Sequence, residues 1–197
     1  MKKIVILAMC FTLFSCSNKW TAHESEIINS DLRIYNIANY ADSLVLRAQS
    51  VDISDKDLMS PECEALVNKM MTIVQTPPND GVGIAAPQIG INRNLVIVQR
   101  FDKESEPFEA YPNLRITHYS DSTQVGPEGC LSIDDIYGDI TRSASIKVSY
   151  FDLKSKKRVE EEISGFTAVI FQHEFDHLNG VLFIDHLEST SSSVVSK

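Results

Sequence analysis

The feature that most constrains this chain is a His-Glu-x-x-His pattern near its carboxyl end, within residues 172–180. On a helix, His173 and His177 project from the same face, so both imidazoles can bind one metal ion. Glu174, beside the first histidine, can act as a base on a water bound to that metal. The Asn-Gly pair at 179–180 favours the end of the helix. The pattern predicts a metallohydrolase, and the alternative is two hydrogen-bonded histidines on a buried helix face.

Two histidines do not complete a catalytic metal site, which usually has three protein ligands and one open position for water. Cys130, within residues 128–132, can supply a thiolate as the third ligand. The other histidines, His23, His118 and His186, fall in an expected tether, a strand and a tail segment. We therefore expect those three histidines to be solvated or structural, and Cys130 to join the two helical histidines.

The charge and length of the chain limit its organisation and partners. It has 27 acidic and 18 basic residues, a formal net charge of −9 over 197 residues. A strongly acidic chain without a basic cluster is repelled by nucleic acid and by anionic lipid surfaces. The length fits one domain with short appendages. We expect a monomer with no nucleic-acid partner.

The amino terminus has the layout of an exported lipoprotein. Met1 is followed by two lysines, and the apolar residues 4–14 are too few to span a bilayer as a helix. Residues 13–16, which end in Cys16, resemble the lipobox of bacterial lipoproteins, in which the cysteine is lipidated. The pattern predicts export and lipid anchoring to the bacterial cell envelope through Cys16. The alternatives are an uncleaved hydrophobic anchor, a buried first strand or, if no signal operates, a cytoplasmic protein.

These features divide the chain into four parts. We expect a signal peptide at residues 1–15, a polar tether at 16–29, a catalytic domain at 30–188 and a flexible tail at 189–197. Within the domain, residues 31–50 show a mixed pattern that does not distinguish a helix from a strand. Wholesale disorder is not expected, because 43% of the residues are hydrophobic.

The hydrophobic pattern of the domain indicates both helices and strands. The Ser-Pro pair at 60–61 suits a helix start, and apolar residues keep helical period until a turn at 76–81. A last helix begins near Ser164, and its inward stripe carries Phe166 and the two metal-type histidines. The predicted class is α+β, with mostly antiparallel strands around a C-terminal metal-binding helix. Strands are expected at 95–98, at 109–119 with a break at Pro112, at 146–150 paired with 159–163, and at 182–184.

Three segments together resemble a known family. Residues 81–88, 128–132 and 172–177 are similar, in order and approximate spacing, to the three signature motifs of peptide deformylases. Arg142 is a further match, and the resemblance covers about residues 40–187. It implies a peptide deformylase-like α+β fold. It also implies hydrolysis of the N-formyl group of formyl-methionyl peptides, with release of formate.

The resemblance implies a cofactor, a substrate and roles for individual residues. The cofactor is one divalent metal ion, with ferrous iron (Fe2+) expected first and zinc, nickel or cobalt as other occupants. The substrate is an N-formylated peptide. The implied site residues are the metal ligands Cys130, His173 and His177, the acid–base Glu174, the oxyanion-stabilising Gln88 side chain and Leu131 backbone N–H, and the substrate-holding backbone of Val82, Gly83 and Gly129.

Two features leave other functions open. Asp134 and Asp135 stand where the family often has proline, and would place two acids near the mouth of the site. An exported chain would also not meet nascent chains at the ribosome. The other hypotheses are hydrolysis of another N-acyl amide, a metallopeptidase of the cell envelope, and a non-catalytic lipoprotein that keeps the fold for binding.

Overall fold

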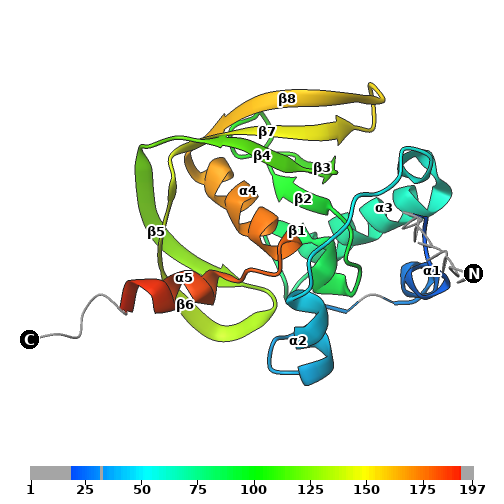
Figure 1. Cartoon of the computed structure of the whole chain (residues 1–197), viewed down its shortest axis with the longest axis horizontal. Helices are drawn as coiled ribbons and strands as arrows, with labels where there is room; N and C mark the ends of the chain where they lie inside the picture. The colour runs from blue at the N-terminus through cyan, green and yellow to red at the C-terminus, as the bar shows by residue number, and fades with distance from the viewer. Residues whose placement is uncertain (1–18, 32, 192–197) are drawn as a thin grey trace, which may run out of the picture.

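Helix α4 (Gly165–Leu178) lies in the middle of the computed structural model, with β-strands around it and the other helices further out (Figure 1). The structure describes residues 19–31 and 33–191. The expected signal peptide and Cys16 lie outside this part of the chain. Because α4 packs against strands of all three sheets, the side chains on its faces meet residues from distant parts of the sequence.

Helix α4 begins and ends where the sequence predicts. Ser164 is its N-cap residue and Asn179 its C-cap residue. Gly180 follows with a φ of +71°, and a side chain there would collide with the backbone of Arg47. One part of the predicted inward stripe is wrong, because Phe166 is 53% exposed and lines a pocket instead of the core.

The strands of the described chain form three antiparallel sheets. The first has the order β1-β2-β3 and the second β4-β7-β8, while β5 and β6 form a two-stranded sheet. The predicted pairing of 146–150 with 159–163 is confirmed as β7 and β8, in which Ile146 lies opposite Ile163. The bounds are β1 Gly83–Ala85, β2 Leu95–Gln99, β3 Phe108–Pro112, β4 Arg115–Tyr119, β5 Thr123–Cys130, β6 Ile133–Ser143, β7 Ser145–Asp152 and β8 Lys157–Ser164.

The break predicted at Pro112 is confirmed, and it separates strands of two different sheets. Pro112 ends β3 and has no backbone N–H to continue a ladder. Asn113 follows with a φ of +53°. Its side chain accepts a hydrogen bond from the Ile53 N–H and donates one to the Ile53 carbonyl, both at 2.8 Å. These contacts hold the turn that directs the chain into β4.

The helix predicted from the Ser-Pro pair is confirmed as α3 (Pro61–Gln75). The Ser60 hydroxyl accepts a hydrogen bond from the Cys63 N–H at 3.2 Å, and Pro61 occupies the first turn. Leu66 and Met70, on the apolar face of α3, are fully buried. The other helical elements are α1 Ala22–Asn29, α2 Tyr40–Leu46, α5 Phe183–Ser191 and the short turns η1 Asp57–Met59 and η2 Ala86–Ile89.

The polar tether expected at 16–29 is wrong for its second half, which is helix α1. Thr21 and Glu24 form a capping box: the Thr21 hydroxyl accepts from the Glu24 N–H, and the Glu24 carboxylate accepts from the Thr21 N–H. Ile28 is buried against the core that contains α3. A single buried residue gives no clear periodicity, so the sequence pattern resembled a tether.

The strand expected at 182–184 is also wrong. Leu182 and Phe183 are buried in a small cluster with Ile133 and Ile140, but helix α5 begins at Phe183. The Asp185 carboxylate accepts a hydrogen bond from the Leu182 N–H at 2.9 Å at the start of this helix. Helix α5 then continues to Ser191, beyond the point at which the flexible tail was expected.

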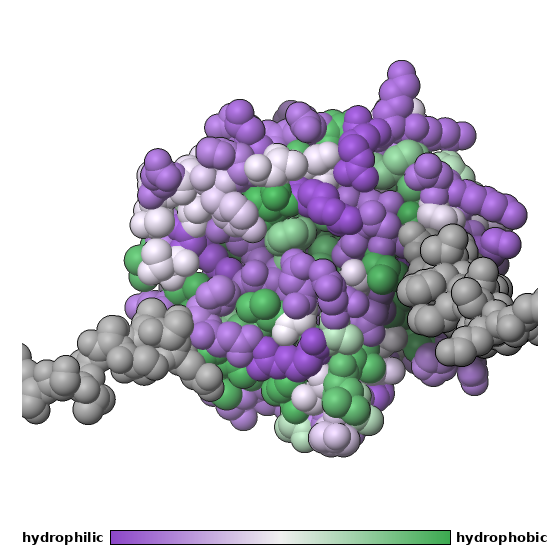
Figure 2. All heavy atoms as spheres, in the orientation of Figure 1, coloured by the Kyte–Doolittle hydropathy of each residue, from purple (hydrophilic) through white to green (hydrophobic). Residues whose placement is uncertain are grey.

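Figure 2 shows a face that is mostly hydrophilic, with small and separate apolar patches. One patch lies at the lower edge of this view, where Figure 1 shows helix α2, and Leu44 of this helix is 58% exposed. No helix within residues 19–31 and 33–191 combines the length and the apolar character needed to cross a bilayer. The apolar residues 4–14 lie outside that part of the chain.

Candidate metal centre

Three metal-type ligands converge where strand β5 ends beside helix α4. Cys130 is the last residue of β5, and His173 and His177 lie four residues apart on α4. Their ligand atoms all lie within 4.8 Å of one another, and the Cys130 Sγ is 3.2 Å from the His177 Nε2. The β5–β6 register shifts between Glu128 and Cys130, and such a bulge redirects a side chain. One thiolate and two imidazoles are a ligand set that suits zinc or ferrous iron.

Glu174 lies beside these ligands and supports the assignment of a metal site. Its side chain is buried, and within the described chain its Oε2 atom has no hydrogen-bond partner. An unpaired buried carboxylate oxygen is costly unless a ligand satisfies it. Burial raises the pKa of Glu174 to about 7, against the opposing effect of His173. The residues present therefore fit a divalent ion with a carboxylate at its open position.

The position of Glu174 depends on a glycine in strand β1. A Cβ atom on Gly83 would lie 2.6 Å from the Glu174 Oε1 and 2.8 Å from the Ile170 side chain. Only a residue without a side chain allows β1 to pass this close to α4. Gly83 therefore sets the distance between the strand that borders the pocket and the carboxylate within it.

Gln88 presents its amide NH2 group to the same site. The Ala85 N–H donates to the Gln88 Oε1 at 2.8 Å, which fixes the orientation of the amide. Its Nε2 atom then donates to the Ser132 hydroxyl at 3.2 Å and lies 3.6 Å from the Cys130 Sγ. Gln88 is buried, so this donor is held in place before any substrate binds.

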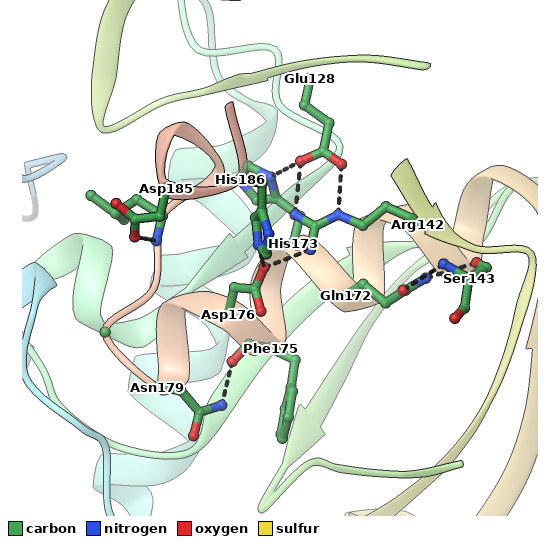
Figure 3. A network of polar contacts seen from close by, with 12 residues as sticks. Glu128, Arg142, Ser143, Gln172, His173, Phe175, Asp176, Asn179, Asp185 and His186 are labelled. Carbon is green, nitrogen blue, oxygen red and sulfur yellow. Dashed lines mark hydrogen bonds and ion pairs between the residues drawn. The ribbon is translucent and has the colours of Figure 1, made fainter. Parts of the chain in front are cut away.

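A chain of charged groups holds His173 from behind (Figure 3). The His173 Nδ1 and the Glu128 Oε2 are 2.9 Å apart. Arg142 binds both oxygens of Glu128, at 2.8 and 3.0 Å, and also the Asp176 carboxylate at 2.6 Å. The His186 Nε2 is 2.8 Å from the same Asp176 oxygen. A carboxylate on the far nitrogen of a metal-binding histidine fixes the tautomer and orientation of the ring.

The Glu128 carboxylate is ionised at neutral pH. Burial acts to raise its pKa, but hydrogen bonds from Arg142 and His173 outweigh burial and lower the pKa to about 2. Glu128 and Arg142 are both almost fully buried. A buried carboxylate that is charged, paired and rigid is suited to hold His173 with its Nδ1 protonated, which leaves Nε2 free to bind metal.

The ligands open into a cavity of about 340 Å³. Most of the site residues predicted from the sequence line it, while His177 lies buried behind them and Cys16 is outside the described chain. The Val82 carbonyl already accepts a hydrogen bond from the Gln99 N–H at 2.8 Å. The predicted residues that line the cavity are Val82, Gly83, Gln88, Gly129, Cys130, Leu131, His173 and Glu174.

The acids expected at the mouth of the site are not there. Neither Asp134 nor Asp135 is among the described residues that line the cavity. The Asp134 carboxylate instead accepts a hydrogen bond from the Asn36 side chain at 2.8 Å. Asp135 has a φ of +56° and lies within β6, between Ile133 and Gly138, where the register with β5 shifts. Both acids therefore belong to the irregular part of β6 and are outside the cavity lining.

A comparison with known proteins identifies the family. A profile described as polypeptide deformylase matches residues 34–193, which is most of the chain. The chain belongs to the peptide deformylase family. The peptide deformylase of Thermotoga neapolitana is 36% identical over 165 residues, which cover 83% of this chain and 93% of that protein.

Solved peptide deformylase structures share the fold. The enzyme from Thermotoga maritima is similar with a TM-score of 0.69 at 34% identity, over 80% of this chain and 97% of that one. The Met-Ala-Ser-bound class I type b peptide deformylase from Acinetobacter baumannii gives a TM-score of 0.71 at 32% identity, over 80% and 98%. The predicted α+β fold with a metal-binding helix is therefore confirmed.

Two residues of this peptide deformylase site had no predicted role. Glu128 is the first residue of the second motif, and the rule that a carboxylate holds a metal-binding histidine calls for such a partner without saying which acid it is. Tyr137 lines the cavity, is 77% exposed, and lies so close to Gly129 that a Cβ there would be 2.6 Å from its ring. No local sequence signal places Tyr137, because its position depends on the pairing of β5 with β6.

Proposed function

We propose that this chain is a metal-dependent hydrolase that removes the N-formyl group from formyl-methionyl peptides and releases formate. The observation that carries the proposal is the convergence of Cys130, His173 and His177 beside the buried Glu174 carboxylate, in a member of the peptide deformylase family. A binding protein would need neither the unpaired carboxylate nor the ligand cluster.

Each group of residues around the cavity has its own role in the proposed reaction. A divalent ion held by the three ligands supplies Lewis acidity and lowers the pKa of a water. Glu174 accepts the proton from the attacking water and returns it to the leaving amine, so that formate and a free amino terminus are produced. The Gln88 amide donates a hydrogen bond where negative charge develops on the formyl oxygen, and the Leu131 N–H is the proposed second donor.

The cavity and the strands beside it suit an extended peptide. Within the described chain, β1 is paired only with β2, and β5 only with β6, so each has one open edge. An extended peptide can add to such an edge through backbone hydrogen bonds. Leu131, Val169 and Ile170 line the cavity and fit an apolar side chain such as methionine. The Acinetobacter baumannii relative is described with Met-Ala-Ser bound, which agrees with a peptide substrate.

We propose ferrous iron as the native metal, with zinc, nickel or cobalt as possible substitutes. A thiolate with two imidazoles binds all of these ions, so the donor set supports a transition metal. Metal analysis of protein purified without oxygen, compared with protein purified in air, tests the assignment. Full zinc occupancy and no iron in the anaerobic sample would replace iron with zinc.

We also propose that the chain acts as a monomer outside the cytoplasm, held to the cell envelope by a lipid on Cys16. The support is the sequence of residues 1–16. Cell fractionation with palmitate labelling, compared between the wild type and Cys16→Ala, tests this. An unlabelled wild-type protein in the cytoplasmic fraction would overturn it, whatever the catalytic activity.

The activity is tested by formate release from formyl-Met-Ala-Ser. The matched substrate acetyl-Met-Ala-Ser distinguishes a deformylase from a hydrolase of other N-acyl amides. Mass spectrometry of the products shows whether any internal peptide bond is cut, as a metallopeptidase would do. We expect formate from the formyl peptide alone and loss of activity in Glu174→Gln. Acetate release at a comparable rate, or internal cleavage, would assign a different function.

A further inference from the structure

Residues 19–30 precede the region that matches the family profile, yet they are bound firmly to the catalytic domain. We propose that this segment is a rigid coupling between a lipid on Cys16 and the domain. It would hold the surface around Trp20 and Met59 against the bilayer. The proposal rests on the proposed lipidation of Cys16, and it adds a defined orientation that lipidation alone does not require.

The beginning of the segment is held by Arg93. The Arg93 guanidinium binds the Glu24 carboxylate through two hydrogen bonds, of 2.6 and 2.9 Å. It also donates to the Lys19 carbonyl at 2.7 Å. The Arg93 side chain is 4% exposed and the Glu24 side chain 14%. A bidentate pair at such low exposure has a fixed geometry, unlike a solvated surface ion pair.

Further contacts hold the remaining length of the segment. The Trp20 Nε1 donates to the Ser60 hydroxyl at 3.1 Å, and the Arg93 guanidinium lies over the Trp20 ring at 5.2 Å. Ile28 is buried against helix α3 and its neighbours. Beyond the end of α1, the Lys69 ammonium donates to the Ser30 carbonyl at 2.6 Å. The segment is therefore part of the folded domain along its whole length.

A docked Lys19 leaves little chain between the domain and a lipid on Cys16. The two residues are three positions apart in the sequence, so the chain between them spans at most about 11 Å when fully extended. The acyl chains of a lipidated cysteine lie within the membrane. The corner of the domain that carries Lys19 must then lie at the bilayer surface, whereas a long flexible tether would let the domain tumble freely.

The side chains at this corner suit a lipid surface. Met59 is 48% exposed and precedes Ser60, the partner of Trp20. Val51 is 44% exposed and forms a β-bridge with Arg93. Trp20 packs one part of its ring against the core that contains α3 and bonds its N–H to Ser60, so only the remaining, exposed part of the ring joins Met59 in the apolar surface of this corner. These features favour the bilayer itself over a protein partner, because the lipid on Cys16 places this corner next to the bilayer.

The same geometry sets the distance from the bilayer to the active site. Helix α3 begins beside Ser60 and has 15 residues, so it is about 22 Å long. Its carboxyl end leads into Asn79 and Gly81, which line the cavity. In Figure 1, α1 and α3 lie together at the right of the view. The cavity is therefore at the far end of α3 from the proposed lipid contact, open to peptides close to the membrane surface.

The only tryptophan in the chain, Trp20, is a direct probe of this contact. The full lipidated protein is purified from membranes and reconstituted in uncharged phosphatidylcholine liposomes, because an acidic chain is repelled by anionic lipid, and some of these lipids carry a fluorescence quencher at the headgroup. We expect strong quenching of Trp20 emission. A variant with about twelve Gly/Ser residues inserted between Asn18 and Lys19, which adds roughly 19 Å of reach, should stay on the liposomes but lose most of the quenching.

The outcomes distinguish this docking proposal from the two other proposals, the lipidation of Cys16 and the deformylase activity. Unquenched Trp20 in liposome-bound wild-type protein would overturn the docking while leaving lipidation and deformylase activity intact. Quenching that requires a membrane protein extract in addition to pure lipid would make the partner a protein, and would also overturn it. If Cys16→Ala stays bound to liposomes, the lipid anchor itself fails. Formate release measured in the same samples reports on the proposed reaction independently.

Discussion

Gly83 and Glu174 are in such close contact that the strand and the helix that carry them exclude any side chain at residue 83. A Cβ on Gly83 would lie 2.6 Å from the Glu174 Oε1. The carboxylate is buried and has an unpaired oxygen within the described chain, so its position is fixed by packing more than by hydrogen bonds. The glycine in the first motif is therefore coupled to the carboxylate in the third.

Gly83→Ala should displace Glu174 and reduce kcat about a hundredfold, because small misplacements of a reacting group can cost that much. The overpacking should also lower the free energy of unfolding by about 1–3 kcal/mol. Formate release and thermal unfolding measure the two effects. Gly126→Ala is the control, since a Cβ on Gly126 meets nothing within 4 Å. Equal activity in the two variants would contradict the coupling.

Glu174→Ala should retain its metal and lose at least about a hundredfold in turnover, the usual size of an acid–base contribution. Its metal ligands remain in place because Cys130, His173 and His177 do not depend on the Glu174 side chain for a hydrogen bond. Metal content and formate release are measured on the same sample. Glu162→Ala, at an exposed position on β8, is the matched control. A near-normal rate with full metal content would remove the assigned role.

Glu128→Gln should weaken metal binding by about 10–100-fold, because the carboxylate that holds His173 becomes a neutral amide. Much of the activity should return when metal is in excess, since Glu174 and Gln88 are unchanged. Competition with a chelator gives the metal affinity. Glu160→Gln, exposed on β8, controls for the lost charge. Unchanged metal affinity, with a lower rate at saturating metal, would instead place Glu128 in the reaction itself.

The sequence predicted those parts of the fold whose signals are local. Ser60 and Pro61 mark the start of α3, and Asn179 and Gly180 the end of α4, because caps and glycine turns act within a few residues. The alternation of apolar and polar residues around Ile146 predicted β7, because this pattern is also a local signal. Helices α1 and α5 were missed because they depend on packing, which a short polar or apolar run does not reveal.

The residues of the candidate site also divide into those with a local sequence signal and those that only the tertiary fold brings into place. The ligands and Glu174 could be predicted because the spacing on one helix and the resemblance to a family identify them. The charged residues that hold His173 could not be predicted, since Glu128 lies 45 residues before it and Arg142 lies on the next strand. The same applies to Asp134, whose expected place at the mouth is wrong because it lies where the β5–β6 register shifts and its carboxylate binds Asn36.

Tyr137→Ala should raise KM for formyl peptides about 3- to 10-fold with little change in kcat. Tyr137 lines the cavity and is 77% exposed, so its ring is available to contact a peptide away from the reacting group. An aromatic contact of this kind contributes about 0.5–1.5 kcal/mol. Tyr119→Ala is the control, because Tyr119 is 46% exposed on β4 and does not line the cavity within the described chain. A fall in kcat at constant KM would contradict this role.

Acidification should release the segment at residues 19–30 from the catalytic domain. Burial acts to raise the pKa of Glu24, but hydrogen bonds from Arg93 and Thr21 outweigh burial and lower the pKa. A carboxylate with a lower pKa in the docked state stabilises docking above its undocked pKa, and this stabilisation is lost as the pH falls through the docked pKa. Docking should therefore be complete at neutral pH and weaken in acid.

The emission spectrum of Trp20 as a function of pH measures this release. In the wild type we expect a shift towards a solvated tryptophan as the pH falls below the ordinary range for a glutamate. Glu24→Gln should lose this transition and already be partly released at neutral pH, because Arg93 keeps only neutral partners in the segment. Glu26→Gln, an exposed position on the same helix, should titrate like the wild type. An unchanged transition in Glu24→Gln would mean that another acid controls the docking of this segment.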